Sequence, residues 1–552
     1  MNHPDVEHQI PKKSDSTETI VDEIELEPPP SPTPEKEMNF GDYLVFGRYS
    51  AFICMVHLFD VIQLSSTYTY STFSNFLPEI TSCGPLTFQN GTTMSEKCAL
   101  MTHSSHPTCE PTYDLVFGSM PSEFGYYCAT EIDVKTALSI QMIALIGGAA
   151  AFGQFSDLYG RKKALVIGSS GTALFNLLTS FTNTLFWFTT GQFIALFFAG
   201  GVVTVLSVFL METLPKNHRL WVIMVFSDSP VFILYSAVAY FCNDWRTLAR
   251  ATAIMAVPHI IMQALAFESP RWLIQRGDLD EAKRVYVAMD KLNGSYTEER
   301  MEVLEKLFEN EREKTKATTK KMKQYYLWHA FCTTTMIKHN VTMAINFCAM
   351  ALVYYALMFN METVSGSVYL NVATMGAISY AFNLTYGILD FAIPAIGRRP
   401  AYMTPIVVVI GLVSVVAGLK YYTISMPWLE TTALLISTAI VSQQMCIVPL
   451  IGGELFPTPV RNAAQSFQQF FTRLGVVLAP QFFVFLKFWP PLPYLAMGGL
   501  MLASLITFGC FIPETKNTPL CDHMPPKTDH IWKYKRMSAK TADLAADKPD
   551  IV

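Results

Sequence analysis

An arginine stands inside a long apolar run near the carboxyl-terminal end of this sequence. Arg473 follows Phe-Thr and precedes Leu-Gly-Val, twelve residues after Arg461, which is about 18 Å along a helix at 1.5 Å per residue. A guanidinium is costly to remove from water, and it offers paired, planar hydrogen bonds that match a carboxylate. Arg473 is therefore the first candidate for binding an anionic group. A structural ion pair with another buried acid is the alternative.

Two acids, Asp60 and Asp228, also lie in apolar runs. Each could neutralise Arg473, hold a cationic group, or carry a coupling proton or Na⁺, and the residues alone do not rank these roles. Asp228 directly precedes Ser229 and Pro230, where a local kink would expose it. For Asp60, a position in water near a helix end is the alternative.

Aromatic and amide side chains in the same runs could line a binding site for bulky organic ions. Aromatic faces accept cations and flat rings, and amides add polar contacts. Packing alone is the simpler role for any single tyrosine. The candidates are Tyr354 and Tyr355, Tyr380 and Tyr386, and Gln443 with Gln444.

Membrane helices are the elements that must position these side chains. Of the 552 residues, 51% are hydrophobic and 15% are charged, against about 25% charged in soluble proteins. This composition excludes a soluble enzyme or scaffold, and the net charge of -5 argues against a nucleic-acid partner. Twelve apolar runs approach the ~20 residues that a membrane helix needs. They are 44–66, 137–155, 164–186, 191–211, 221–242, 247–267, 336–359, 368–393, 401–421, 431–452, 463–486 and 494–512.

The basic residues predict how these helices cross the membrane. Lys and Arg gather after the even-numbered runs, so the positive-inside rule places both termini in the cytosol. Residues 1–43 are acidic and proline-rich and predict a disordered tail without a cleaved signal peptide. Residues 513–552 predict a second cytosolic tail, and residues 268–338 predict a partly helical cytosolic loop. The two six-helix halves then cover residues 44–267 and 339–512.

The loop at residues 71–135 falls outside the cell by the same rule. It carries Cys83, Cys98, Cys109 and Cys128. An even number of cysteines in an oxidising compartment predicts two disulfides, with three possible pairings. Asn90-Gly-Thr is a glycosylation acceptor on the same side of the membrane.

Three pairs of motifs recur in the same order and indicate a duplicated six-helix unit. Each lies at the predicted cytosolic end of the corresponding run, and two such halves around a central site are the plan of many secondary transporters. The pairs are Gly160-Arg-Lys with Gly397-Arg-Arg, Glu212 to Arg219 with Glu454 to Arg461, and Glu268 with Glu514, at offsets of 237, 242 and 246 residues.

The charged residues of these motifs predict an ion-pair network at the cytosolic rim. Pairs such as Asp157 with Arg161, and Glu212 with Arg219, would join helix ends and bias the balance between two conformations. Setting the topology alone is the alternative for each basic residue. The predicted network contains Asp157, Arg161, Glu212, Arg219, Glu268, Arg271, Arg398, Glu454 and Arg461.

These motifs together resemble solute carrier family 22 of the major facilitator superfamily. The resemblance rests on Gly153-Gln-Phe-Ser-Asp-Leu-Tyr-Gly-Arg-Lys162, on Glu268-Ser-Pro-Arg-Trp-Leu273, on Pro513-Glu-Thr-Lys516 and on the cysteine-bearing first loop. It implies an all-α membrane protein with twelve helices that transports organic cations, organic anions or carnitine. In that family, an Arg at the position of Arg473 accompanies the anion and carnitine branches. The second copy of the rim motif departs from the pattern, because Pro394 stands where the first copy has an acid.

The sequence favours a carrier that moves small organic ions across the plasma membrane by alternating access. Anions or zwitterions such as carnitine are favoured over cations as its substrates. An organic cation transporter, a receptor-like or vesicle protein on the same fold, and a sugar porter are the alternatives. The resemblance also matches Tyr354 and Tyr355 to a tyrosine pair of anion-transporting members.

No phosphate-binding glycine loop, metal-ligand spacing or nucleophile motif is found, so no enzyme activity, cofactor or metal is expected. Na⁺, a proton or a counter-substrate would couple transport, and the oligomeric state stays open.

Overall fold

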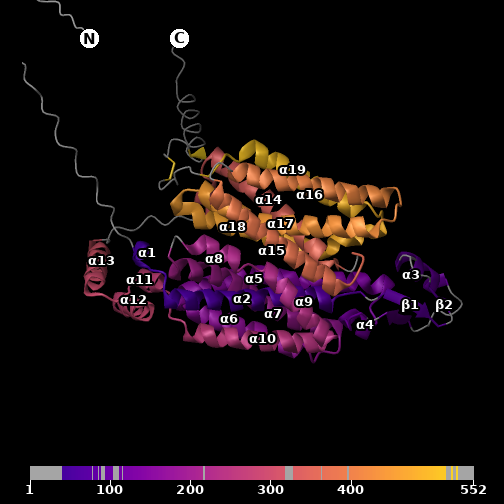
Figure 1. The fold of residues 1–552 in the computed structure, drawn as a ribbon, viewed down its shortest axis with the longest axis horizontal. Coiled ribbons are helices and arrows are strands. Elements are labelled where there is room, and N and C mark those ends of the chain that lie inside the picture. Colours follow the sequence, from indigo (N-terminus) through magenta and orange to yellow (C-terminus); the bar gives the residue numbers. More distant parts are fainter. Residues whose placement is uncertain are drawn as a thin grey trace, which may run out of the picture. The chain divides into compact units, whose positions relative to one another are not determined.

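The computed structural model describes residues 40–77, 79–84, 86–88, 94–103, 111–114, 116–215, 218–317, 327–361, 364–393, 397–516, 524–525 and 530–531. Long helices that run back and forth dominate this part of the chain (Figure 1). The predicted tail at residues 1–39, the glycosylation acceptor Asn90 and Cys109 lie outside the described residues.

The predicted membrane runs correspond to helices, and the fifth run is broken into two. Backbone groups cannot stay unpaired in lipid, so continuous apolar runs fold as helices. The first half contains α2 (Arg48–Ser74), α5 (Glu131–Tyr159), α6 (Arg161–Thr179), α7 (Leu185–Thr213), α8 (Arg219–Val225), α9 (Ser229–Cys242) and α10 (Trp245–Leu265). The second half contains α14 (Thr334–Phe359), α15 (Val368–Ala392), α16 (Arg398–Tyr421), α17 (Pro427–Leu455), α18 (Thr458–Phe482) and α19 (Leu492–Phe511), with the 3-10 turn η5 (Phe483–Lys487) after α18.

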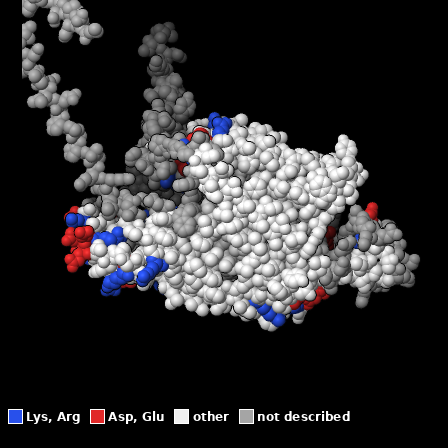
Figure 2. Space-filling view, viewed as in Figure 1, with Lys and Arg blue, Asp and Glu red and all other residues white. Residues whose placement is uncertain are grey.

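Eleven helices in the described part of the chain are long and apolar enough to cross a membrane. The remaining predicted run belongs to α6, which has 19 residues and a buried polar face that includes Ser169, Thr172 and Asn176. Asn176 accepts a hydrogen bond from Gln192 of α7 at 3.2 Å, so this polar side chain of α6 has its partner inside the bundle. On the face seen in Figure 2, charged side chains lie at the two ends of the bundle and leave an uncharged band between them. This distribution is the one that a bilayer requires.

Equivalent helices pack in the same way in the two halves. α6 packs on α7 and α10, and α16 packs on α17 and α19; α2 packs on α10 as α14 packs on α19. The halves meet where α5 packs on α18, α9 on α15 and α2 on α14. The duplicated unit predicted from the motif offsets is therefore present in the helix packing.

A group of short helices lies at one end of the bundle, which we call the rim end (Figure 1). It comprises α1 (Phe40–Tyr43), α11 (Pro270–Arg276), α12 (Leu279–Asn293), α13 (Glu298–Ala317) and the 3-10 turn η3 (Leu327–Phe331). The loop at residues 268–338 was predicted to be partly helical, and α12 and α13 occupy the two segments with helical spacing.

The start of the described chain differs from the predicted disordered tail. Residues 40–43 form α1, and the Tyr43 hydroxyl donates to the Asp290 carboxylate at 2.5 Å. Arg300 pairs with Asp290 at 3.1 Å and its guanidinium lies 4.4 Å from the Tyr43 ring centroid. Asp290 and Arg300 thus hold Tyr43 of α1, so the predicted disorder does not extend over residues 40–43.

The opposite end of the bundle, which we call the loop end, carries a small domain inserted between α2 and α5. Its three strands, β1 (Glu79–Cys83), β2 (Leu86–Thr87) and β3 (Pro111–Asp114), form an antiparallel sheet in the order β2-β1-β3. The helices α3 (Met94–His103) and α4 (Met120–Phe124) and the turn η1 (Cys128–Thr130) complete it. The Glu123 carboxylate accepts hydrogen bonds from Arg246 and from the Trp245 ring, both at 2.7 Å, which ties the domain to α10.

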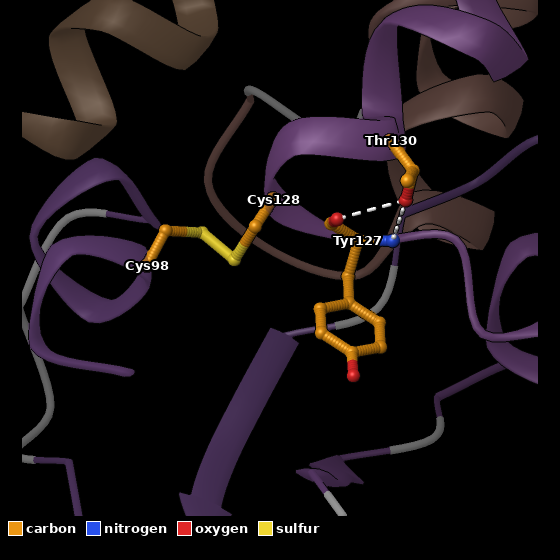
Figure 3. Close-up of a disulfide and its surroundings, with 4 residues drawn as sticks. All are labelled: Cys98, Tyr127, Cys128 and Thr130. Carbon is orange, nitrogen blue, oxygen red and sulfur yellow. Dashed lines mark hydrogen bonds between the residues drawn. A yellow bond between two sulfur atoms is a disulfide. The ribbon is translucent and has the colours of Figure 1, made fainter. Parts of the chain in front are cut away.

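A disulfide joins Cys98 on α3 to Cys128 on η1 (Figure 3). Beside it, the Thr130 hydroxyl donates to the carbonyl of Tyr127 and accepts from the amide of Tyr127, which closes the turn that leads into α5. Cys83 is also disulfide-bonded. Of the three pairings left open by the sequence, one contains a Cys98–Cys128 bond, and it is the pairing compatible with this structure.

Replacing Cys98 with Ser is expected to loosen the loop-end domain without changing the bundle. The bond closes a loop with a sequence separation of 30 residues, and such a closure contributes about 3–4 kcal/mol to the domain that it constrains. Limited proteolysis of the purified protein should cleave residues 71–130 faster in the variant. Cys510→Ser is the matched control, since Cys510 is a free, exposed thiol; equal cleavage in the two variants would contradict a structural role for the bond.

Candidate functional site

The predicted substrate residue Arg473 lies on α18, which packs on α14, the helix that carries Tyr355. Gly475 permits this close packing of α18 on α14, because a methyl group there would overlap the carbonyl oxygen of Cys348. Arg473 is partly buried, and its charge acts on the Tyr355 hydroxyl. The guanidinium therefore lies within the bundle beside an aromatic side chain, as its position in the apolar run predicted.

Asp228 lies at the break between α8 and α9. It occupies the N-cap position of α9, and Ser229 and Pro230 form the first turn of that helix. Proline favours the first turn because its missing N–H has no partner there. The amino-terminal end of a half-helix carries a partial positive charge, which stabilises a carboxylate. The kink predicted from Ser-Pro is therefore present, and it places Asp228 inside the bundle rather than at its rim.

Tyr355 lies in the electrostatic field of both Asp228 and Arg473. Among the residues that the structure describes, neither Asp228 nor Arg473 forms an ion pair within 4.0 Å. Within the described part of the chain, no acid neutralises Arg473 by direct pairing in this conformation. Two opposite charges therefore act on one tyrosine, and the Asp228 carboxylate is held by backbone N–H groups at the start of α9.

Aromatic rings cluster around Tyr355, on which these two charges act. The rings of Tyr354 and Tyr355 meet edge to face with centroids 5.0 Å apart, and Tyr355 also contacts Phe359 at 5.5 Å. Tyr68 of α2 approaches Tyr355 with a centroid distance of 6.4 Å, so this cluster crosses from one half of the bundle to the other. We call Tyr68, Tyr354, Tyr355 and Phe359 the aromatic cluster.

Three further residues belong to this site, although the sequence did not single them out. Ser442 of α17 lies beside the Tyr354 hydroxyl, and Cys446, one turn later, lies in the field of Asp228. Tyr68 joins from the first half. The four-residue spacing of Ser442 and Cys446 marks one helix face, but only the packing of α17 on α14 and α15 identifies that face as the inner one.

Three predicted substrate residues lie elsewhere or have other partners. Asp60 contacts His259 at 2.5 Å and accepts from Gln263 at 3.0 Å, so its partners all belong to the first half. Tyr386 lies near the rim end, where Arg398 donates to its hydroxyl at 3.3 Å. Gln443 is buried and accepts from Gln444 at 3.0 Å. Asp60 and Tyr386 are thus turned toward these neighbours and lie apart from the group around Tyr355 in this conformation.

The rim network of the first half centres on Arg161. Its guanidinium pairs with Asp157 at 2.5 Å and with Glu212 at 3.3 Å. The Glu268 carboxylate accepts from the backbone amides of Arg161, Lys162 and Ser269 at 2.9, 3.1 and 2.9 Å. One arginine thus joins α5, α6 and α7, and one glutamate joins the start of α6 to the start of α11.

The second half repeats this arrangement in its described residues. Arg398 pairs with Glu454 at 3.6 Å, and Glu514 accepts from the amides of Arg398, Arg399 and others at 2.7 to 3.1 Å. Burial opposes ionisation of Glu514, but these backbone N–H groups together hold its pKa below the usual value. The position equivalent to Asp157 holds Pro394, which lies outside the described residues.

The glycines of the two rim motifs make room for these carboxylates. A methyl group on Gly160 would overlap the carboxylate of Glu268, and one on Gly397 would overlap that of Glu514. Gly160 also has a φ of 112°, which side chains rarely adopt. The repeated glycine is therefore explained by the repeated carboxylate–amide contact.

Two predicted rim residues take other roles. Arg219 does not pair with Glu212; it donates to the carbonyl of Leu214 at 3.1 Å, just as Arg461 donates to the carbonyl of Phe456 at 3.3 Å. Arg271 forms no ion pair with a described residue and lies near Arg219. Burial and the charge of Arg271 together lower the pKa of Arg219. Arg219 and Arg461 act as caps of the preceding turn.

The repeated six-helix halves, the broken helix with a charge at its start and the paired rim motifs define a secondary transporter of the major facilitator fold, which is not an enzyme. Residues 52–524 match the family described as "Sugar (and other) transporter", and the chain belongs to that family.

Curated relatives support the resemblance to solute carrier family 22. The chain is 28% identical to an "Organic cation transporter-like protein" of Drosophila melanogaster, over 73% of this chain and 71% of that protein. It is 24% identical to the human "Organic cation/carnitine transporter 2" over 78% and 74% of the two chains, and 26% identical to the mouse "Solute carrier family 22 member 7" over 72% and 74%.

Solved structures support the fold. The inward-open xylose transporter XylE from E. coli superposes with a TM-score of 0.58 at 14% identity, covering 85% of this chain and 98% of that chain. XylE bound to 6-bromo-6-deoxy-D-glucose superposes with a TM-score of 0.59 at 15% identity, covering 86% and 98%. At this identity the likeness concerns the arrangement of helices alone.

Proposed function

We propose that the protein carries small organic ions across the plasma membrane by alternating access, and that it prefers zwitterions or anions to simple cations. The observation that carries this proposal is the unpaired arginine of the site. Arg473 faces Tyr355 inside the bundle and has no ion-pair partner among the described residues. A buried guanidinium of this kind suits a substrate carboxylate, which it can bind through two parallel hydrogen bonds.

Asp228 and the aromatic cluster supply a second binding element for the same molecule. A quaternary or protonated amine is attracted by a carboxylate and by the faces of tyrosine rings. Asp228 and Arg473 both act on Tyr355, so a zwitterion with its two charges a few bonds apart can contact both. This supports a carnitine-like substrate class, in agreement with the names of relatives that are organic cation/carnitine transporters.

The rim networks supply the two-state element of the mechanism. Arg161 and Arg398 each join helix ends within one half, so each half moves as a unit while the contacts of α5 with α18 and of α9 with α15 open and close. The basic loops at the rim end support a cytosolic location of that end and of both termini. A gradient of Na⁺ or protons, or exchange against a second substrate, supplies the energy.

The proposal is tested by an uptake panel in cells that express the protein at their surface. The panel contains a labelled zwitterion (carnitine), an organic anion (p-aminohippurate) and an organic cation (tetraethylammonium), each with and without Na⁺. Saturable uptake of carnitine or of the anion is expected. Surface protein without uptake of any class would contradict the carrier function.

An organic cation transporter is the second candidate, because Asp228 and the aromatic cluster alone suffice for a cation. Asp228→Asn separates substrates that carry a positive charge from pure anions. If the substrate is a zwitterion or a cation, the neutral variant should lose about tenfold to 100-fold in affinity, since a charge-assisted contact contributes about 1.5–3 kcal/mol. If the substrate is an anion, its affinity should be unchanged or higher. Competition for uptake measures both outcomes, and Asp278→Asn, on the rim-end loop, is the control.

A further inference from the structure

Hydrogen bonds between the two halves are concentrated at the loop end of the bundle. Among the described residues, Lys135 of α5 donates to the side chain of Asn360 at the end of α14 at 2.8 Å, and Gln481 of α18 donates to Thr136 of α5 at 3.2 Å. Lys135 and Asn360 are 3% and 1% exposed, so their contact is shielded from water. The halves are therefore joined at the loop end in this conformation.

Tyr369, the second residue of α15, contacts the first half with its backbone and its ring. Its carbonyl accepts a hydrogen bond from the Ser236 hydroxyl of α9 at 2.5 Å. Its ring stacks on that of Phe73 of α2 with centroids 5.7 Å apart, and it meets the Tyr240 ring of α9 edge to face at 5.5 Å. One residue of the second half is thus held by two helices of the first.

The hydroxyl of Tyr369 reaches the inserted loop-end domain. It donates to the carbonyl of Val116 at 3.0 Å. Phe117, the next residue, is 0% exposed and meets the Tyr369 ring edge to face with centroids 6.3 Å apart. Val116 and Phe117 lie between β3 and α4. The domain that is inserted in the first half therefore contacts the second half through Tyr369.

The segment that carries Val116 is fixed to the first half. The Gly118 amide donates to the Asn243 carbonyl at 3.0 Å, and the Trp245 amide donates to the Gly118 carbonyl at 2.9 Å, so this segment pairs with the turn between α9 and α10. The contacts of α4 with α10 described above add to this attachment. Because Val116 is held by the first half, its bond to Tyr369 must break when the halves separate at the loop end.

Packing alone does not account for the hydroxyl of Tyr369. Replacing Tyr369 with Phe would keep the ring contacts with Phe73, Phe117 and Tyr240, since these need only an aromatic face and edge. The hydroxyl adds one hydrogen bond that exists while the loop end is closed. A contact made in only one conformation stabilises that conformation relative to the other.

We propose that the bond between the Tyr369 hydroxyl and the Val116 carbonyl is a latch through which the loop-end domain holds the loop end closed. The halves of such a carrier rock against each other, so the latch sets how often the substrate site opens at this end. The net contribution of one neutral hydrogen bond corresponds to about fivefold in that equilibrium. The inference rests on the proposed carrier function, to which it adds a role for the inserted domain.

Tyr369→Phe tests the latch, because it removes the hydroxyl and leaves the ring. Substrate outside the cell binds only while the loop end is open, so its apparent affinity follows the population of that conformation. The half-saturation concentration for uptake of labelled carnitine is expected to fall up to about fivefold in cells that express the variant. Tyr240→Phe is the matched control and should behave like the wild type. The Tyr240 ring also lies against Tyr369, but its hydroxyl bonds to no described residue.

Hydrogen–deuterium exchange of the purified full-length protein gives a second measurement that does not depend on transport. The first turns of α15, residues 368–376, pack on α9 at the loop end, and a methyl group on Gly376 would overlap the carbonyl oxygen of Ser229. Exchange that proceeds through opening follows the population of the open form. Amides of this segment should therefore exchange up to about fivefold faster in Tyr369→Phe than in the wild type or in Tyr240→Phe.

The two measurements separate the latch from the carrier function. Faster exchange in Tyr369→Phe without uptake by any of the three proteins would contradict the carrier function and leave the latch supported. Equal exchange in Tyr369→Phe and the wild type, an unchanged or higher half-saturation concentration in this variant, or an equal effect of Tyr240→Phe would overturn the latch.

Discussion

Replacing Arg473 with Ala is expected to reduce the affinity for carboxylate-bearing substrates by about 100-fold. The guanidinium lies in the bundle beside Tyr355 and has no ion-pair partner among the described side chains, so a bound carboxylate would be its main partner. Truncating one member of a buried, hydrogen-bonded charge pair costs about 2–5 kcal/mol, and 2.8 kcal/mol corresponds to about 100-fold. Concentration dependence of initial uptake, corrected for surface protein, measures the effect.

The effect of replacing Arg473 on uptake should depend on the charge of the substrate. Arg473→Lys keeps the charge but loses the paired geometry, so it should recover only part of the affinity. Cation uptake, where present, should not fall in either variant, since the removed charge repels cations. Arg284→Ala, on an exposed face of α12, removes one positive charge outside the site and should behave like the wild type. Unchanged anion and zwitterion uptake in Arg473→Ala would assign a structural role to Arg473.

Hydrophobic length and charge placement sufficed to predict the helices of this fold. Each predicted run overlaps a helix or, for the fifth, a broken pair, because lipid forces apolar segments of this length into one backbone conformation. The motif offsets predicted the repeat for a related reason: Gly160 and Gly397 contact equivalent carboxylates. A contact that recurs at the same place in each half requires the same residue types there, so the repeat can be recognised in the sequence.

Hydrophobic length and charge placement did not predict which neighbour each side chain faces. Asp60 and Asp228 look alike in the sequence, since both are single acids in apolar runs. The first turns toward His259 and the second sits at the start of a half-helix near Tyr355. Which helix faces which neighbour depends on contacts between residues far apart in the chain, such as the packing of α2 on α10. The contact of Tyr386 with Arg398, which lies beyond a helix end, was not predictable for the same reason.

The two rim networks differ in strength, although they share one plan. Arg161 is held by two carboxylates, and the buried one, Glu212, has a side chain that is 11% exposed. Among the described residues Arg398 pairs with Glu454 at 3.6 Å, and the Glu454 side chain is 22% exposed and also accepts a hydrogen bond from Thr515 at 2.6 Å. Removing Arg161 therefore leaves an acid buried without its cation, whereas removing Arg398 leaves Glu454 partly solvated and still hydrogen-bonded.

Arg161→Ala is accordingly expected to impair the carrier more than Arg398→Ala. Loss of one partner from a buried pair costs about 3–5 kcal/mol, whereas loss of a partly exposed pair costs about 1 kcal/mol. If the networks stabilise one of two conformations, the population of that conformation falls on the order of 100-fold in the first variant and about fivefold in the second. Initial uptake rates and the midpoint of thermal unfolding in detergent measure the two effects on the same preparations.

The double variant Arg161→Ala/Glu212→Gln identifies the cause of this difference. Neutralising Glu212 removes the buried charge that Arg161 leaves behind, so the double variant should recover most of the thermal stability that Arg161→Ala loses. Asp157, whose side chain is 70% exposed, needs no such compensation, and Asp157→Asn should alter stability by less than about 1 kcal/mol. Equal losses in Arg161→Ala and Arg398→Ala would contradict the assignment of the stronger contact to the first half, and no recovery in the double variant would mean that burial of Glu212 is not the source of the cost.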